Sequence, residues 1–175
     1  RYYSEGMKVM TTTYPIKPAL YAVTKSTNYL PNTLMQLEAK EKGFDNGIFI
    51  DSNGNVGEGS NMNTAFVGQD DKLKHPKFDN ILSGCTAKRL LELAESLIGK
   101  GVIKDVTICD ISVQEARESK EMMFIGSSIG VAPIVEWDNQ KIGNGKPGPV
   151  VSELEKLLSK DITNSKDRLI EVQYP

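Results

Sequence analysis

The string Lys25-Ser26-Thr27-Asn28-Tyr29-Leu30-Pro31-Asn32 begins with the lysine on which the interpretation of this chain most depends. Before it, residues 11–23 are rich in Thr, Tyr and Pro, and because proline disfavours a helix we expect an extended linker or edge strand there. After it, apolar residues recur at helical spacing up to Gly43. Lys25 is therefore predicted to lie between an extended segment and the start of a helix, from where it can point inward.

Three further strings are rich in glycine and small polar residues, and each lies next to a predicted helix, strand or hairpin. Gly57-Glu58-Gly59-Ser60-Asn61-Met62-Asn63 follows Asn53-Gly54, the strongest short hairpin signal. Ile81-Leu82-Ser83-Gly84-Cys85-Thr86 leads into the clearest helical pattern, and Phe124-Ile125-Gly126-Ser127-Ser128 is a strand that ends in a small-residue turn. Small residues allow a ligand to approach the backbone closely, so each string is a candidate binding segment.

The rest of the chain alternates irregularly between strand and helix patterns, which indicates a single mixed α/β domain. One helix is expected from Leu30, Leu34 and Leu37, with Pro31 in its first turn. A second is expected over 86–98, stopped by glycines, with an apolar face of Leu90, Leu91, Leu93, Ala94 and Leu97. The other expected elements are strands at 47–50, 64–67, 106–109 and 122–125, a hairpin at 134–142 around Asp138-Asn139, a short helix after the capping box Ser112-Val113-Gln114-Glu115, and a helix at 150–158.

The composition is that of an ordinary globular protein, with 39% hydrophobic residues, 25% charged residues and a net charge of −2. No basic stripe indicates nucleic-acid binding, and no apolar run approaches the roughly 20 residues of a membrane span. Cys85 and Cys109 do not form a disulfide framework, which favours a reducing compartment. The single histidine, His75, is expected in a polar loop, so a histidine-rich metal site is excluded and we expect no metal.

Together the four strings resemble the class IV aminotransferases, fold-type-IV pyridoxal-phosphate (PLP) enzymes that include D-amino-acid and branched-chain transaminases and aminodeoxychorismate lyase. The plant D-amino-acid-transaminase and lyase-like members are the most similar. The resemblance runs from about Gly6 to Lys156. It implies the C-terminal cofactor domain of that fold, an α+β domain with a mixed sheet or pseudo-barrel and flanking helices.

The same resemblance divides the chain into three parts. It implies an interdomain linker and edge strand at 1–23, a PLP-binding large domain at 24–160 and a C-terminal tail at 161–175. The family's small N-terminal domain is absent from the match, so we expect the chain to be a fragment of a longer protein.

The resemblance assigns Lys25 to a Schiff base with the cofactor aldehyde and to proton transfer at the substrate's α-carbon. A neutral amine is needed for both steps. Glu58, in a Glu-Gly-x-x-x-Asn pattern completed by Asn63, would keep the pyridine nitrogen protonated, since a carboxylate beside it favours the charged ring. The plain alternatives are a solvated surface lysine and an exposed turn glutamate. Tyr29 either reaches the cofactor's phenolic oxygen or is a core tyrosine.

A phosphate site is expected at the start of the 86–98 helix, because free N–H groups and the helix dipole attract anions there. The resemblance assigns it to the backbone N–H of Cys85 and the hydroxyl of Thr86. It adds the hydroxyl of Ser128, with Ser127 as its neighbour. The alternative is that Ser83 or Thr86 simply caps the helix.

The function implied by the resemblance is PLP-dependent transamination of an amino acid, with D-amino acids favoured, to a 2-oxo acid. The alternatives are aminodeoxychorismate lyase, a branched-chain aminotransferase, and a catalytically inactive fragment. The expected partners are these small-molecule substrates, with no nucleic acid and no membrane, and a homodimer in the intact protein. The compartment is not readable from the chain, and plant-like similarity implies a plastid, with the cytoplasm as the alternative.

Overall fold

The computed structural model describes residues 2–165 and 168–173. An eight-stranded sheet forms its centre, in the order β2-β1-β7-β6-β3-β4-β5, with β8 paired to β7. The strands are β1 (Met7–Thr11), β2 (Asn46–Ile48), β3 (Asn63–Val67), β4 (Lys72–Pro76), β5 (Asp105–Cys109), β6 (Glu121–Gly126), β7 (Gly130–Trp137) and β8 (Gln140–Lys141). The helices are α1 (Tyr2–Glu5), α2 (Ala19–Ala22), α3 (Leu30–Glu41), α4 (Cys85–Ile98), α5 (Val113–Arg117) and α6 (Pro149–Asn164).

The sheet is mixed, as the sequence predicts. β1 pairs parallel with β2 and β7, and β4 pairs parallel with β5, whereas the pairs β3–β4, β3–β6, β6–β7 and β7–β8 are antiparallel. The path of paired strands ends at β2 and β5, so within the described residues the sheet stays open. The expectation of an α+β domain with a mixed sheet and flanking helices is therefore confirmed.

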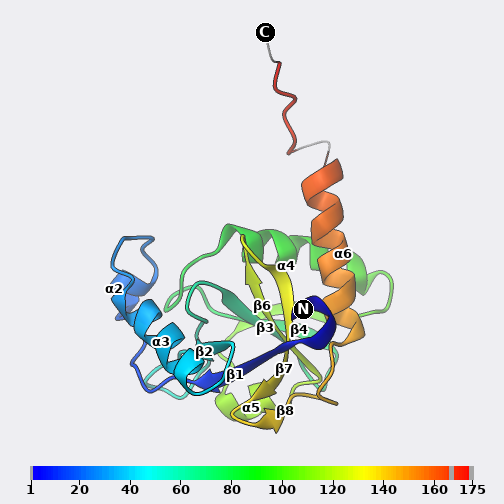
Figure 1. Cartoon of the computed structure of the whole chain (residues 1–175). Helices are drawn as coiled ribbons and strands as arrows, with labels where there is room; N and C mark the ends of the chain where they lie inside the picture. The colour runs from blue at the N-terminus through cyan, green and yellow to red at the C-terminus, as the bar shows by residue number, and fades with distance from the viewer. Residues whose placement is uncertain (1, 166–167, 174–175) are drawn as a thin grey trace.

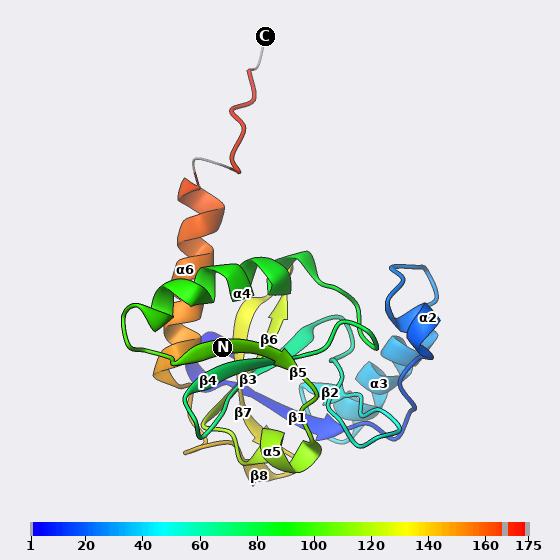
Figure 2. The same cartoon turned by 180° about the vertical axis from the view of Figure 1, so that it is seen from behind.

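Two hydrophobic cores lie on opposite faces of the sheet. Helices α4 and α6 pack together over one face, as Figures 1 and 2 show from opposite sides. Their core joins Leu90, Leu97 and Leu154 to residues of β3, β4 and β6. The other core surrounds Trp137, with α5 beside it.

Helix α4 buries the apolar face that its sequence predicts. Leu90, Ala94 and Leu97 are fully buried, and the helix is followed by Gly99 as its C-cap. Arg89 joins it to α6 through two bonds to the Asp161 carboxylate, at 2.9 and 2.5 Å. Leu93 is only partly buried at the edge of this core.

Helix α3 is present where it was expected, with Pro31 in its first turn, but the expected leucine face is not the buried one. Leu30 is 64% exposed and Leu37 is 50% exposed. The buried side contains Met35, which packs against Gly47, where a Cβ atom would lie 2.4 Å from Met35 Cγ. It also contains Glu38, whose carboxylate accepts hydrogen bonds from two threonines of the chain after β1.

Three expectations along the chain are corrected. The 1–23 segment includes β1, which lies between β2 and β7 and so is not an edge strand. The same segment contains the short helix α2, which begins directly after Pro18, because proline is tolerated at a helix start. The helix expected at 150–158 runs on to Asn164, so the first residues of the expected tail at 161–175 belong to α6. Residues 166, 167, 174 and 175 of that tail lie outside the described residues.

His75 does not lie in a polar loop, because it is a fully buried residue of β4. Its Nδ1 lies 2.6 Å from the Pro76 carbonyl oxygen, its ring lies beside Phe78, and its Nε2 has no hydrogen-bond partner in the described part of the chain. Burial lowers the pKa of His75 to about 4, although the Pro76 carbonyl opposes this shift. The ring is therefore a neutral core group at physiological pH.

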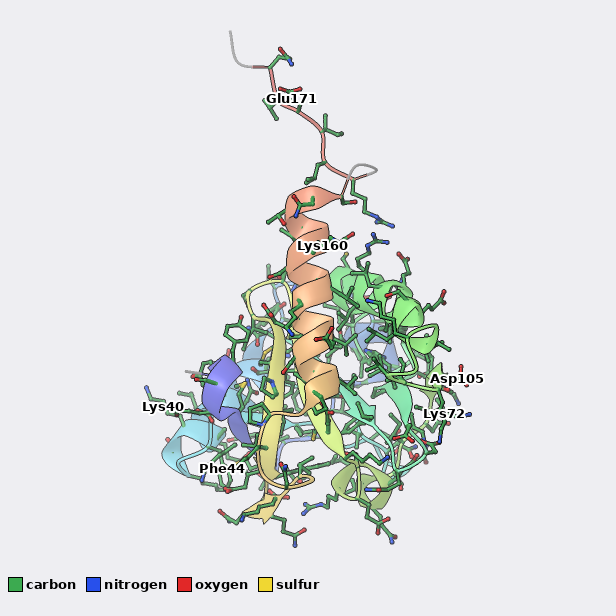
Figure 3. The ribbon with its side chains drawn as sticks, turned by 90° about the vertical axis from the view of Figure 1, so that its right-hand side faces the viewer. Lys40, Phe44, Lys72, Asp105, Lys160 and Glu171 are labelled. Carbon is green, nitrogen blue, oxygen red and sulfur yellow. The ribbon has the colours of Figure 1, made fainter. Side chains whose placement is uncertain are left out.

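The edge of the sheet at β4 and β5 is polar. Figure 3 shows Lys72 and Asp105 close together there, and their charged groups lie 3.3 Å apart. The strands at 64–67, 106–109 and 122–125, the hairpin at Asp138-Asn139 and the Ser112-capped α5 all occur where the sequence places them. The strand expected at 47–50 is shifted, since β2 ends at Ile48.

Candidate functional site

A cavity of about 320 Å³ lies between the α2–α3 segment, the loop before β3, the start of α4 and the end of β6. Figure 2 shows the chain that precedes α4 running close to α2 and α3. The cavity brings together seven of the residues that the sequence singles out: Lys25, Tyr29, Glu58, Asn63, Cys85, Thr86 and Ser127. They come from separate parts of the chain, so only the tertiary fold assembles them.

Lys25 lies in the connection between α2 and α3, at the wall of this cavity, and it is exposed, as the surface-lysine alternative expects. Its Nζ donates a hydrogen bond to the Tyr29 hydroxyl and lies 5.0 Å from the centre of the Tyr29 ring. Tyr29 lies one residue before α3, half-buried, and lines the cavity, so it is not a core tyrosine. The tyrosine thus fixes the direction of the lysine amine.

Glu58 is a buried carboxyl, with only 5% of the residue exposed, so it is not an exposed turn glutamate. Burial raises its pKa to about 7, because a charged carboxylate is poorly solvated there. The backbone N–H of Leu82, 3.1 Å from Oε2, and the positive charges of Lys17 and Lys25 act in the opposite direction. Such a carboxyl is poised to take up a cationic N–H donor from a ligand.

The glycines on either side of Glu58 have a different purpose from the one expected. A Cβ on Gly57 would lie 2.7 Å from Ile16 Cδ1, and a Cβ on Gly59 would lie 2.6 Å from a ring carbon of Phe124. Neither glycine lines the cavity. They therefore allow protein side chains to pack against the loop, rather than a ligand, and so hold Glu58 in place.

Asn63 connects the loop to the start of α4. Its Nδ2 donates to the Leu82 carbonyl at 2.8 Å, while the N–H of the same leucine donates to Glu58. A Cβ on Gly84 would lie 2.2 Å from Asn63 Oδ1, so this approach requires glycine. Leu82 is thereby bonded on both sides of its backbone to the two polar residues of the loop.

The start of α4 has no side-chain cap. Its N-cap is Gly84, and neither Ser83 nor Thr86 makes a capping hydrogen bond, so the simple capping alternative is wrong. Cys85 and Thr86, the first two residues of the helix, line the cavity, and the helix dipole favours an anion beside them. Cys85 is exposed, and its thiol forms no disulfide.

The two serines in the turn between β6 and β7 line different cavities. Ser127 lines the 320 Å³ cavity, whereas Ser128 lines a neighbouring one of about 450 Å³ that shares Tyr29, Asn32 and Ser60 with it. Ser127 therefore lies at the same cavity as Cys85 and Thr86, and the assignment of Ser128 to the phosphate stays a prediction.

Two further residues, Lys17 and Asn32, line the cavity although no sequence pattern singled them out as site residues. Lys17 is half-buried, with Nζ 5.8 Å from the centre of the Tyr29 ring. Asn32 is buried, its Nδ2 donates to the Ser60 carbonyl at 2.5 Å, and its Oδ1 has no partner among the described residues. Asn32 closes the opening string and could have been found there, but nothing in the sequence marks Lys17.

Within residues 2–165 and 168–173, no group of three or more His, Cys, Asp or Glu side chains is arranged to hold a metal ion. In the same residues, no helix has the length and apolar character needed to span a bilayer.

A family model described as "Amino-transferase class IV" matches residues 5–137. The chain is 49% identical over 158 residues to "D-amino-acid transaminase, chloroplastic" of Arabidopsis thaliana, a match that covers 90% of this chain and 42% of that protein. It is 31% identical over 155 residues to a branched-chain-amino-acid aminotransferase of Pseudomonas aeruginosa, covering 87% and 48%. The chain thus spans about half the length of the curated relatives it matches.

Solved structures of branched-chain amino acid aminotransferases are also similar to this chain. A branched-chain amino acid aminotransferase from Escherichia coli superposes with a TM-score of 0.79 at 26% identity, covering 89% of this chain and 52% of that one. The PLP form of a branched-chain amino acid aminotransferase from Thermobaculum terrenum superposes with a TM-score of 0.81, covering 89% and 50%. At 22% identity, this second likeness concerns the fold alone.

Proposed function

Because the chain belongs to the class IV aminotransferase family, we propose that it is the PLP-binding part of an enzyme that moves the amino group of an amino acid to a 2-oxo acid. The single observation that carries this proposal is the meeting of Lys25 and the buried Glu58 at one cavity. A lysine amine and a carboxyl, held by different segments, are what this cofactor requires at its two ends.

The groups of the cavity fit PLP. Its volume of about 320 Å³ falls within the range of about 300–1,000 Å³ for small-molecule sites. Lys25 would hold the aldehyde carbon, Glu58 the ring nitrogen, and Tyr29 the phenolic oxygen. The uncapped start of α4, with the Cys85 N–H and the Thr86 and Ser127 hydroxyls, would hold the phosphate.

Bound PLP supplies an electron sink that stabilises negative charge at the α-carbon of the amino acid. Glu58 keeps a proton at the ring nitrogen, since a buried carboxyl is stabilised in its charged form only beside a cation. Lys25 Nζ carries the proton away from the α-carbon and returns it to the product side. Tyr29, which accepts the hydrogen bond from Lys25, sets the direction of that amine.

A preference for D-amino acids is supported by the 49% identity to the plant protein named as a D-amino-acid transaminase. A branched-chain L-amino acid substrate is the second candidate, supported by the likeness to branched-chain enzymes. The compartment we propose is the plastid, from the chloroplastic relative. For the intact protein we propose a homodimer, as the family resemblance implies.

The exposed apolar surface around α2 and α3 favours one alternative, that this chain by itself is catalytically inactive. α2, α3 and the residues between them expose large apolar side chains, an arrangement typical of a covered interface. These are Leu20, Tyr21, Val23, Leu30 and Leu37, each at least 40% exposed.

Borohydride reduction of the chain with PLP, followed by peptide mass mapping, tests the proposal. We expect the phosphopyridoxyl group on Lys25, and its loss in Lys25→Ala. Lys17→Met is the matched control, because it removes another lysine from the same cavity and should keep the label. Labels scattered over several lysines, with Lys25 unmodified, would contradict the proposal. Transamination by a chain that takes up the label, with D-alanine against L-leucine as donor, then separates the two substrate classes.

A further inference from the structure

We propose that Lys17 binds the carboxylate of the amino acid or 2-oxo acid substrate, as a second cationic residue of the cavity. The inference rests on the proposed function, since it names the substrate group that the site would recognise. The segment around Lys17, not the opening string itself, would then contribute to specificity.

The position of Lys17 is fixed on both sides. Ile16, the residue before it, packs into the space left by Gly57, where a Cβ would lie 2.7 Å from Ile16 Cδ1. Pro18, the residue after it, is the N-cap of α2, with φ −51° and ψ 143°. The ammonium group lies 5.8 Å from the centre of the Tyr29 ring, a cation–π distance. Lys17 therefore projects toward the cavity from a held backbone.

The charge in the cavity calls for an anionic ligand. Three of the residues that line it are acidic or basic: Lys17, Lys25 and Glu58. Within residues 2–165 and 168–173, Lys17 forms no ion pair, whereas many surface lysines of the chain do. Glu58 feels the charge of Lys17 but forms no ion pair with it among the described residues, so two lysines and one carboxyl leave an excess of positive charge that an anion from outside balances.

The substrate carboxylate fits this need better than the cofactor phosphate. The phosphate already has donors at the uncapped start of α4, which comes from a different part of the chain. If the Lys25 amine held the cofactor, Lys17 would be the free ammonium group that remains among the residues lining the cavity. Amino acids and 2-oxo acids share one anionic group, the carboxylate, and a single lysine recognises it in both.

Binding of propionate, measured from backbone amide shifts in NMR titrations, tests this assignment. The chain is titrated in phosphate buffer, so that the start of α4 is already occupied, and again after loading with PLP. Propionamide, which has the same shape without the charge, is the ligand control. We expect propionate to bind saturably and propionamide not to bind.

Three variants identify the residue responsible. Lys17→Met keeps the apolar stem over Tyr29 but should weaken propionate binding about tenfold, the loss expected for one charged hydrogen bond. Lys17→Arg keeps the charge and should restore affinity to within about twofold. Lys88→Met is the matched control, because Lys88 lies at the same 5.8 Å from the Phe78 ring but does not line the cavity.

The outcomes separate this inference from the proposed function. If the unaltered chain does not bind propionate, or if Lys17→Met binds it equally well, the inference is wrong. If Lys17→Met weakens PLP binding and leaves propionate binding unchanged, Lys17 belongs to the cofactor phosphate and the inference is also wrong. Failure of the proposed function has a separate readout, which is the absence of a phosphopyridoxyl label on Lys25. The propionate titration in phosphate buffer does not require bound PLP, so it tests Lys17 in that case as well.

Discussion

Helices α4 and α3 both carry leucines at helical spacing, yet α4 buries its leucines and α3 exposes its own. In α4, Leu90 and Leu97 are fully buried against the sheet. In α3, Leu30 and Leu37 are exposed, and Asn32 and Glu38 are buried instead. Helical spacing therefore identifies the helix in both cases but identifies the packed face in only one.

The difference follows from what each helix covers. α4 lies over the centre of the sheet with α6 beside it, so its apolar face meets a wide apolar surface (Figure 1). α3 lies against β2 at the end of the sheet, where it meets the polar chain after β1. α4 is thus stabilised by burial of its leucines, whereas α3 combines the burial of Met35 and Ala39 with a hydrogen-bonded carboxylate.

The largest effect is expected from shortening a buried leucine. Leu90→Ala should lower the free energy of unfolding by about 2–5 kcal/mol, because it leaves a cavity in the α4 core. The same change at the exposed Leu37 should lower it by no more than about 0.5 kcal/mol. Urea denaturation of both variants measures the contrast, and equal losses would show that the exposed face of α3 is packed in solution.

Protonation of His75, which is buried in β4, gives a pH-dependent measure of the stability of the core beneath α4. Burial holds its pKa at about 4, below the ordinary value of 6.5, so the unfolded chain takes up a proton in this interval and the folded chain does not. Stability should therefore fall by up to about 3 kcal/mol as the pH drops from roughly 6.5 to 4. His75→Gln should remove that part of the pH dependence in unfolding curves, and an unchanged slope would refute it.

Glu38 provides the corresponding test for α3, and the pH range over which it changes stability lies lower than that of His75. Burial alone would raise its pKa, but hydrogen bonds from Lys42, Thr12 and Thr13 outweigh this and lower the pKa to about 2. The stabilisation is complete above the ordinary value of 4.5 and is lost as the pH falls toward 2. Glu38→Gln should cost about 1–3 kcal/mol at neutral pH. Calorimetry should show this difference shrinking in the acid range, and a constant difference would contradict the assignment.

Glu58 lies between the two helices, in the cavity to which both contribute residues. Its pKa is raised to about 7, so its ionisation opposes folding as the pH rises from 4.5 through 7. Glu58→Gln should therefore leave stability unchanged near pH ~4 and raise it by up to about 3 kcal/mol near pH ~8. Thermal melts at the two pH values measure this, and a variant that is less stable at both would show that the carboxyl is structurally required.

Much of the fold could be predicted because local signals and packing agree. α4 has one unbroken apolar face, Ser112 caps α5 through the Glu115 N–H, and Asp138-Asn139 forms the turn between β7 and β8. β4 was not predicted, because its lysines and Pro76 are atypical of a strand. Its parallel pairing with β5 covers this segment in the folded protein. Parallel pairing joins segments far apart in sequence, so a short polar strand gives no local signal of it.

The candidate site was predictable in its motifs but not in its full lining. Lys25, Glu58 and Thr86 lie in strings with a recognisable pattern, and the fold brings them to one cavity. Lys17 has no such pattern, because its place depends on the packing of Ile16 and on the short helix α2. Ser128 and Ser127 differ by one position in a turn, and only the course of the backbone decides which of them lines the cavity.

The double attachment of Leu82 determines where the cavity can be remodelled. One backbone unit is tied to Glu58 through its N–H and to Asn63 through its carbonyl, and Gly84 leaves no room for a larger residue beside Asn63. Any change that moves this wall would displace the carboxyl and the start of α4 at once. Engineering toward bulkier substrates should therefore leave this corner unchanged; Thr24 and Ser26 also line the cavity, but their hydroxyls bond the Leu20 carbonyl and the Asn28 N–H on either side of Lys25.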